Sequence, residues 1–157
     1  DATPGLEGAA YRDAFQARRC IVPIDAFYEW ADRAGRRQPY LVRPAGPSPA
    51  GLAGLWARWQ RGDGSVLESC TVLTTEAAPA LRDLHARMPV VVAPPDLADW
   101  LDPARPGDAA LLARLVSHGP EAFEVYPVSE RVNRAEVDDP RCLERVPEPP
   151  RQESLFG

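Results

Sequence analysis

The chain has 157 residues, of which 45% are apolar, and a formal net charge of −5. This length indicates one domain that buries most of its surface without metals or disulfides. No apolar run approaches the roughly 20 residues that span a bilayer, and the start lacks the layout of a signal peptide, so we expect a cytoplasmic protein. Cys20, Cys70 and Cys142 show no Cys-x-x-Cys spacing. That disfavours a disulfide framework, a zinc site or another cofactor site, and predicts reduced thiols.

The charge is distributed unevenly along the chain. All 18 basic residues are arginine, which with abundant Ala and Pro is typical of GC-rich bacterial coding, although arginine also suits bidentate phosphate recognition. Residues 1–90 hold 11 arginines against 10 acidic residues, whereas residues 91–157 hold 7 against 13. A basic groove on the first part of the chain is therefore compatible with the negative total.

The hydrophobic pattern predicts short strands joined by tight turns, followed by helices. Glycine-containing turns at 32–37 and 62–64 separate strands that we expect to pair as antiparallel hairpins. The predicted fold class is α+β, with mostly antiparallel twisted sheets forming a barrel-like core and short peripheral helices. We expect strands at 20–24, 27–30, 39–42, 52–60, 66–74, 90–92 and 123–128, and helices at 11–18, 79–84, 96–101 and 108–117.

The last residues differ in composition from the rest. From Pro147 the chain becomes Pro-rich and polar, which predicts an extended, mostly disordered tail. We therefore expect a domain at 1–146 and a tail at 147–157.

Two ionisable residues stand among bulky apolar neighbours, where burial shifts a pKa toward the range of proton transfer. Glu29 lies between Tyr28 and Trp30. On a strand its side chain points away from both rings, and on position alone this is the solvent face. His85 follows a predicted helix, where a satisfied core histidine and a general acid are equally compatible with the sequence. His118 lies at the end of a predicted helix, where its charge suits the helix dipole.

Nearby residues have ordinary interpretations as well. Thr74 and Thr75 lie between a strand and a helix, where threonine commonly caps the helix. Arg87 is compatible with an ion pair to Asp83. Each of these signals is weak by itself.

In combination, four segments resemble the SOS response-associated peptidase family. They are Arg-Arg-Cys-Ile-Val-Pro-x-Asp-x-Phe-Tyr-Glu-Trp at 18–30, Thr-Thr-x-Ala at 74–77, His-x-Arg-Met-Pro-Val-Val at 85–91 and Tyr-Pro-Val-Ser-x-x-Val-Asn at 126–133. The resemblance runs from about Tyr11 to Val146. It implies a monomeric sensor of abasic sites in single-stranded DNA, without a cofactor or a membrane partner.

In that family an N-terminal Cys, exposed by self-processing, condenses with the aldehyde of the abasic site and closes a thiazolidine ring. The resemblance gives Glu29 the role of positioning or deprotonating the amine, His85 that of an acid at the sugar, and Thr74 a place in the pocket. It places Arg87 at a phosphate, with Arg19, Trp30 and Asn133 as further DNA contacts.

The chain departs from the family at the nucleophile. The family's opening Met-Cys-Gly-Arg and its Asn-Ala-Arg segment have no match, and none of the three cysteines is N-terminal. A thiol without a free α-amine forms no thiazolidine, so we expect peptidase and cross-linking activity only in a longer protein that carries the upstream Cys. The alternative is a non-covalent single-stranded DNA-binding module that has lost the nucleophile.

The tail contains a second motif. Gln152, Leu155 and Phe156 match the Gln-x-x-Leu-Phe peptides by which bacterial repair proteins dock on the β sliding clamp. An extended tether would present the Leu-Phe anchor to an apolar groove while the Gln amide fixes the register. The alternative is a chance match in a tail that folds back on the domain.

Overall fold

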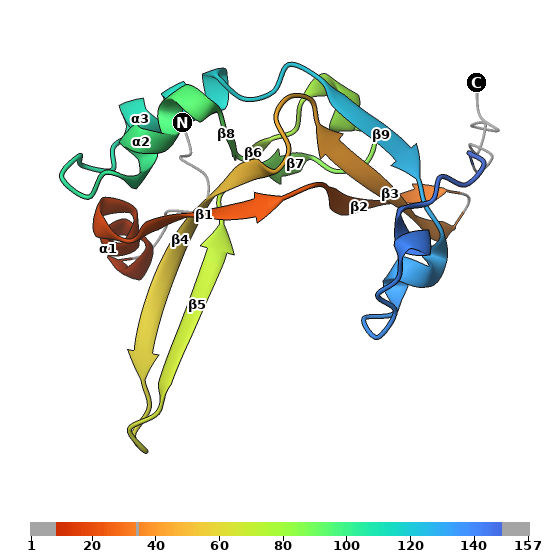
Figure 1. Ribbon diagram of the computed structural model, residues 1–157. Coiled ribbons are helices and arrows are strands. Elements are labelled where there is room, and N and C mark those ends of the chain that lie inside the picture. The colour runs from red at the N-terminus through yellow and green to blue at the C-terminus, as the bar shows by residue number, and fades with distance from the viewer. Residues whose placement is uncertain (1–8, 34, 149–157) are drawn as a thin grey trace.

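A computed structural model describes residues 9–33 and 35–148 of the chain. Its fold is α+β with antiparallel sheets, as predicted, but the sheets of the described residues do not close into a barrel (Figure 1). None of the described helices is long and apolar enough to cross a membrane. The main elements are α1 (Ala9–Ala17), β1 (Arg19–Ile24), β2 (Phe27–Arg33), β3 (Arg36–Pro44), β4 (Ala50–Gln60), β5 (Val66–Val72), β6 (Thr74–Glu76), β7 (Arg87–Pro89), β8 (Val91–Val92), α2 (Leu97–Leu101), α3 (Ala109–Ser117) and β9 (Phe123–Pro127).

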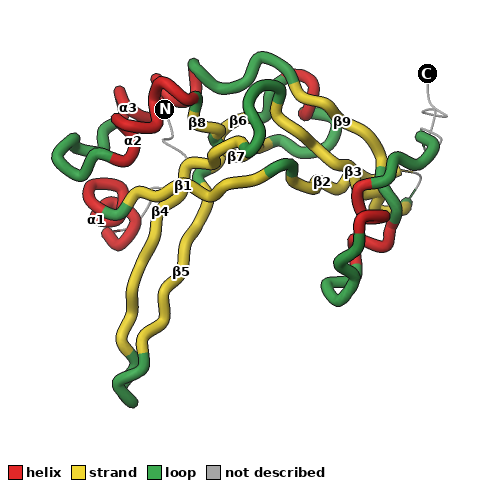
Figure 2. Tube along the Cα trace, viewed as in Figure 1, coloured by secondary structure: helices red, strands yellow, loops and turns green. Residues whose placement is uncertain are grey.

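The first sheet has the order β1-β4-β5, with β8 also paired to β4. Helices α1, α2 and α3 lie at this end of the molecule (Figure 2). Apolar side chains of the sheet and the helices form one core, which includes Leu55, Val92, Trp100 and Leu111. Asp108 caps α3 by accepting a hydrogen bond from the backbone N–H of Leu111 at 2.7 Å, which fixes where the helix begins.

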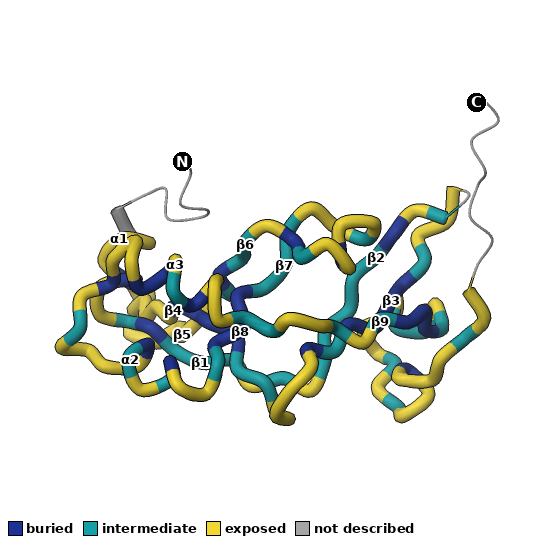
Figure 3. Tube along the Cα trace, turned by 90° about the horizontal axis from the view of Figure 1, so that it is seen from above, coloured by how far each residue is buried: buried dark blue, intermediate teal, exposed yellow. Residues whose placement is uncertain are grey.

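The second sheet has the order β2-β3-β9 and is apolar on both faces. Because side chains alternate along a strand, neighbouring residues of β3 enter different cores. Leu41 belongs to a cluster with Tyr126 and Val128, whereas Val42 belongs to a cluster with Leu81. Consecutive residues of β3, 39–42, are buried, as expected when both faces are covered (Figure 3).

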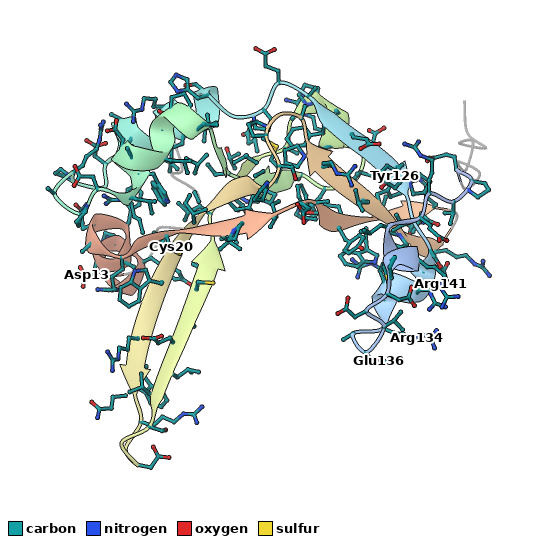
Figure 4. The ribbon with its side chains drawn as sticks, in the orientation of Figure 1. Asp13, Cys20, Tyr126, Arg134, Glu136 and Arg141 are labelled. Carbon is teal, nitrogen blue, oxygen red and sulfur yellow. The ribbon has the colours of Figure 1, made fainter. Side chains whose placement is uncertain are left out.

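Each face of this sheet is covered by a different segment. Residues 77–88 supply side chains to the cluster around Val42. On the other face, the hydroxyls of Tyr28 and Tyr126 donate to the backbone oxygens of Cys142 and Leu143, at 3.2 and 3.1 Å. The end of the domain thus lies against this face, around Tyr126 and Arg141 (Figure 4).

The predicted elements are confirmed with shifts at their ends. The helix expected at 79–84 is a 3-10 helix, Pro79–Leu81, followed by turns. The strand expected at 66–74 is divided between β5 and β6. The sequence pattern missed β7 and three 3-10 helices, Pro94–Asp96, Glu130–Asn133 and Pro140–Leu143.

Candidate functional site

Glu29 lies on the face of β2 that residues 77–88 cover. Phe27, two positions earlier and so on the same face, packs in the cluster of Leu81 and Met88, whereas Tyr28 packs in the opposite cluster. Glu29 is half-buried. The position-based prediction of a solvent-facing carboxylate is therefore wrong, because a segment some 50 residues later in the chain covers this face.

The surroundings of Glu29 make it a stronger base than an ordinary carboxylate. Burial raises the pKa of Glu29, while the charge of His85 and a backbone hydrogen bond at Trp30 act in the opposite direction. The charge of His85 thus reaches Glu29, although the two residues are 56 positions apart in the chain. A basic carboxylate beside an imidazole can accept a proton at one atom and supply one at another.

His85 lies near the end of the segment that connects β6 to β7. The backbone N–H of His85 donates to Leu81 O at 3.0 Å. The backbone N–H of Ala77 donates to Ala86 O at 3.0 Å, which joins the two ends of this connecting segment. The ring Nδ1 lies 2.9 Å from Arg87 O and 3.1 Å from Arg87 N. Nδ1 therefore has an acceptor partner when protonated and a donor partner when not.

The two backbone groups of Arg87 at Nδ1 hold the His85 ring in place. The imidazole keeps a backbone partner at Nδ1 in either tautomer and in the imidazolium form. Since the side chain is exposed, its Nε2 edge can face a ligand. His85 is thus suited to donate or accept a proton at Nε2 without changing its position.

Thr74 and Arg87 lie on the paired strands β6 and β7. Arg87 Nε donates to Thr74 Oγ1 at 2.9 Å, and Arg87 Nη2 donates to Thr74 O at 2.6 Å. Two bonds fix one edge of the guanidinium, so the side chain holds its charge in place. Thr74 therefore positions Arg87, a role that differs from the predicted place of Thr74 in the acid/base pocket.

Trp30 and Asn133 meet on the opposite face of β2. Trp30 Nε1 donates to Asn133 Oδ1 at 2.7 Å, which fixes the edge of an indole ring that is only half-buried. The structure thus forms two groups: Glu29, His85, Arg87 and Thr74 in one, Trp30 and Asn133 in the other. Within the described residues β2 pairs only with β3, so it is an edge strand, with Glu29 and Trp30 on its two faces.

Arg19 does not belong to either group. Its side chain is 8% exposed, and its guanidinium donates to five backbone oxygens at 2.5–2.9 Å. These oxygens belong to Phe15, Gln16, Trp100, Asp102 and Arg105. The prediction of a DNA contact at Arg19 is withdrawn, because its donors tie α1 to α2 and the loop after it.

His118 and the start of the tail have hydrogen-bond partners in the domain. His118 caps the C-terminal end of α3, as predicted, and its Nδ1 lies 2.8 Å from a carboxylate oxygen of the buried Asp96. Gln152, Leu155 and Phe156 lie outside the described residues. The start of the tail is held, since Tyr40 Oη donates to Glu148 Oε1 at 2.7 Å. Within the described part of the chain, no three Cys, His, Asp or Glu side chains gather as a metal site would require.

Comparison with known proteins now identifies the family. The model of the SOS response associated peptidase family matches residues 6–135. The chain belongs to this family. The family's matched region contains all six residues of the two groups described above.

Similar proteins are found in bacteria and vertebrates. Abasic site processing protein YoqW of Bacillus subtilis is 30% identical over 139 residues, which are 88% of this chain and 62% of that protein. Abasic site processing protein HMCES of Xenopus tropicalis is 30% identical over 161 residues, covering 89% of this chain and 47% of that protein. This SOS response associated peptidase chain thus spans less than two thirds of these curated relatives.

Solved structures support the fold of the family member. A protein from Bacteroides thetaiotaomicron superposes with a TM-score of 0.77 at 22% identity, covering 90% of this chain and 62% of that one. A phage-related protein from Bordetella bronchiseptica gives a TM-score of 0.58 at 32% identity, with 77% of this chain covered. The antiparallel α+β arrangement is therefore that of known protein structures.

Proposed function

We propose that the full-length protein senses abasic sites in single-stranded DNA and forms a covalent cross-link through an N-terminal Cys upstream of Asp1. The relatives at 30% identity are named abasic site processing proteins, which supports a role in processing such DNA. The proposal rests on the half-buried Glu29, whose pKa burial raises and whose pKa the charge of His85 acts to lower. This pair supplies a base and an acid in one site.

The proposed chemistry uses both members of the pair. His85 protonates the ring oxygen of the abasic sugar through Nε2 while the C1 hydroxyl gives its proton to water, which opens the ring to the aldehyde, and Glu29 removes a proton from the N-terminal ammonium. The amine then attacks the aldehyde, and loss of one water gives an imine. The Cys sulfur adds to the imine carbon while the imine nitrogen gains the thiol proton, which closes the thiazolidine.

We propose the same pair for self-processing. Removal of the initiator Met exposes the Cys amine, and this hydrolysis requires a base for water and an acid for the leaving amine. Glu29 and His85 are the residues of the described site that can fill these roles. The tail motif at Gln152, Leu155 and Phe156 remains our proposal for a clamp contact.

The test is incubation with single-stranded DNA that contains one abasic site, followed by a heated denaturing gel. We expect a shifted band for the full-length protein, none for the 157-residue chain, and none for the full-length protein with its N-terminal Cys replaced by Ala. A shift with the 157-residue chain would contradict the assignment of the nucleophile. Absence of a shift with the full-length protein, despite DNA binding, would favour the non-covalent alternative.

Arg87 is expected to bind a phosphate beside the lesion. Replacing Arg87 by Ala should weaken single-stranded DNA binding about tenfold or more, since one charge-assisted contact is lost. It should also make the slope of log K against log salt concentration shallower by about one unit, the contribution of one phosphate contact. Fluorescence anisotropy at several salt concentrations measures both.

Matched variants separate the parts of this contact. Thr74→Val removes the Oγ1 anchor of Arg87 but keeps the carbonyl anchor, so its effect should be smaller than that of Arg87→Ala. Arg58→Ala, an exposed arginine of β4, should leave affinity unchanged. Equal losses for Arg58→Ala and Arg87→Ala would show that only general charge matters.

Trp30 is expected to stack on a base. Loss of one aromatic platform costs about 1–3 kcal/mol of binding free energy, so Trp30→Ala should raise the Kd at least about fivefold. Asn133→Ala should cause a smaller loss, because the ring stays but its fixed edge does not. If Asn133→Ala weakens binding as much as Trp30→Ala, Asn133 contacts the DNA itself.

A further inference from the structure

A small cavity lies between the connection from β3 to β4, strand β8 and the end of α3. Its volume is about 170 Å³. Proline, alanine, glycine, valine and leucine residues form its walls, together with one histidine, His118. None of the six residues of the candidate site described above lines it. The cavity is thus a second, separate place where a ligand can be buried.

Backbone hydrogen bonds fix the walls of this cavity relative to one another. Strands β4 and β8 pair in a register that sets Gly51 opposite Val92, and both residues line the cavity. The backbone N–H of Ala45 donates to Ala122 O at 2.9 Å, which ties the connection from β3 to β4 to the segment that follows α3. The cavity is therefore preformed, as small-molecule sites usually are.

His118 is the one polar side chain among the described residues that line the cavity. Its Nδ1 lies 2.8 Å from Asp96 Oδ2, and Arg114 Nε lies 3.2 Å from the other oxygen of the same buried carboxylate. A carboxylate paired with arginine only accepts hydrogen bonds, so Nδ1 carries a proton and Nε2 is the ring nitrogen left for an occupant. Nε2 accepts a hydrogen bond when the ring is neutral and donates one when the ring is charged. A hydroxyl group is a partner for both forms.

The size and the walls of the cavity fit one aromatic ring. A dry apolar cavity of about 150 Å³ in another protein binds benzene. Val91 and Val92 are buried and form an apolar deep side, whereas the side chain of His118 is 51% exposed and lies at the mouth. A ring hydroxyl that reaches His118 is therefore at the mouth, with the carbon edge of the ring inside. A tyrosine of a protein partner would enter with its hydroxyl first, which would place that hydroxyl on the apolar side.

We propose that this cavity binds a small, free phenolic molecule of one ring, whose hydroxyl forms a hydrogen bond with His118 Nε2. Asp96 fixes the ring of His118, and the apolar walls bury the carbon edge of the phenol. The proposal holds independently of the abasic-site chemistry, because the two sites share no residue.

NMR titration of the full-length protein with p-cresol and with toluene, which lacks the hydroxyl, tests the proposal. We expect saturable shifts of the amides of Val91, Val92 and Ala93 with both ligands. The Kd of p-cresol should be about three- to tenfold lower than that of toluene, the usual effect of one hydrogen bond. Absence of saturable shifts at these residues, or equal affinities for the two ligands, would overturn the proposal.

The variant His118→Phe isolates the hydrogen bond. Phenylalanine keeps a ring at this position but has no nitrogen, so the ratio of the two Kd values should fall to about one. Because both ligands are measured on the same variant, a general loss of affinity leaves this ratio unchanged. A preference for p-cresol that persists in His118→Phe would overturn the assignment of His118.

Filling the cavity gives a second readout. Ala93→Leu places a larger side chain in the wall and should abolish binding of both ligands. Ala98→Leu is the matched control, at an exposed position of α2 outside the lining, and should leave both Kd values unchanged. Undiminished binding of p-cresol to Ala93→Leu would show that the ligand binds elsewhere and would overturn the proposal.

N-acetyl-tyrosinamide separates a free phenol from the side chain of a protein partner. It carries the same ring with backbone amides attached opposite the hydroxyl. We expect it to bind at least about tenfold more weakly than p-cresol, because these amides would enter the apolar side of the cavity without hydrogen-bond partners. Equal or tighter binding would indicate a tyrosine side chain of a protein as the occupant and would overturn the proposal of a free phenol.

Discussion

Replacing Glu29 by Gln in the full-length protein is expected to slow cross-link formation about 10²–10⁴-fold, the usual contribution of a general acid or base. Gln keeps the size and polarity of the side chain but cannot accept the proton. Binding of single-stranded DNA should stay unchanged, because we propose the phosphate and base contacts at Arg87 and Trp30. The rate is measured from the appearance of the shifted band over time.

The raised pKa of Glu29 sets the pH dependence. The carboxylate must be ionised to act as a base, so the rate should fall as pH drops through the raised pKa of Glu29. In Glu29→Gln this acidic limb should disappear. If the rate of the variant still falls at low pH in the same way, a group other than Glu29 causes this pH dependence.

Stability should respond in the opposite direction to activity. A carboxyl whose pKa is raised on folding favours the folded state at low pH, and this contribution is lost as pH rises through the folded pKa. At neutral pH the ionised Glu29 therefore costs stability, and Glu29→Gln should have an equal or higher Tm. Glu121→Gln, at an exposed loop position, is the matched control and should change neither the rate nor the Tm. A clear loss of Tm in Glu29→Gln would indicate a structural role.

Replacing Arg19 by Ala is expected to destabilise the domain by about 3 kcal/mol or more, since five buried carbonyl bonds lose a charged donor. For a domain of this size, that corresponds to a Tm lower by roughly 6–12 °C. Thermal unfolding followed by circular dichroism measures the change. The reason is that α1, α2 and the loop at 102–105 share this one guanidinium.

Two variants control the Arg19 experiment. Arg19→Lys should restore only part of the stability, because an ammonium has three donors and cannot reach five carbonyl oxygens. Arg12→Ala, an exposed arginine of α1, should change the Tm by less than about 1 °C. If Arg19→Ala keeps its Tm but loses DNA affinity, Arg19 contacts DNA and does not mainly stabilise the domain.

The local elements were predictable because their signals are local. The turns at Gly35 and Gly64 have positive φ angles of 77° and 84°, which glycine adopts without a steric cost, so the hairpins follow from sequence. Asp108 marks the start of α3 in the same way. The roles of Glu29 and His85 came from the family resemblance and stay a prediction; in the structure the charge of His85 acts to lower the pKa of Glu29.

What the sequence did not predict depends on contacts between distant segments. Nothing near Glu29 shows that residues 77–88 cover its face of β2. Nothing near Arg19 shows that its guanidinium meets oxygens more than 80 positions away. The exposure of apolar side chains on both faces of the β4-β5 hairpin could have been predicted from the sequence. Trp56 and Trp59 are an odd number of residues apart, so they must lie on opposite faces of a strand.

The most direct test of the paired action of Glu29 and His85 is a double-mutant cycle on the cross-linking rate. Glu29→Gln, His85→Ala and the double variant are compared in the full-length protein on the same abasic-site DNA, with DNA affinity measured alongside. Groups that act on one reaction as a unit give strongly non-additive effects. We predict that the double variant is only slightly slower than the slower single variant. Fully multiplicative losses, or full rates in either single variant, would contradict a shared acid/base site.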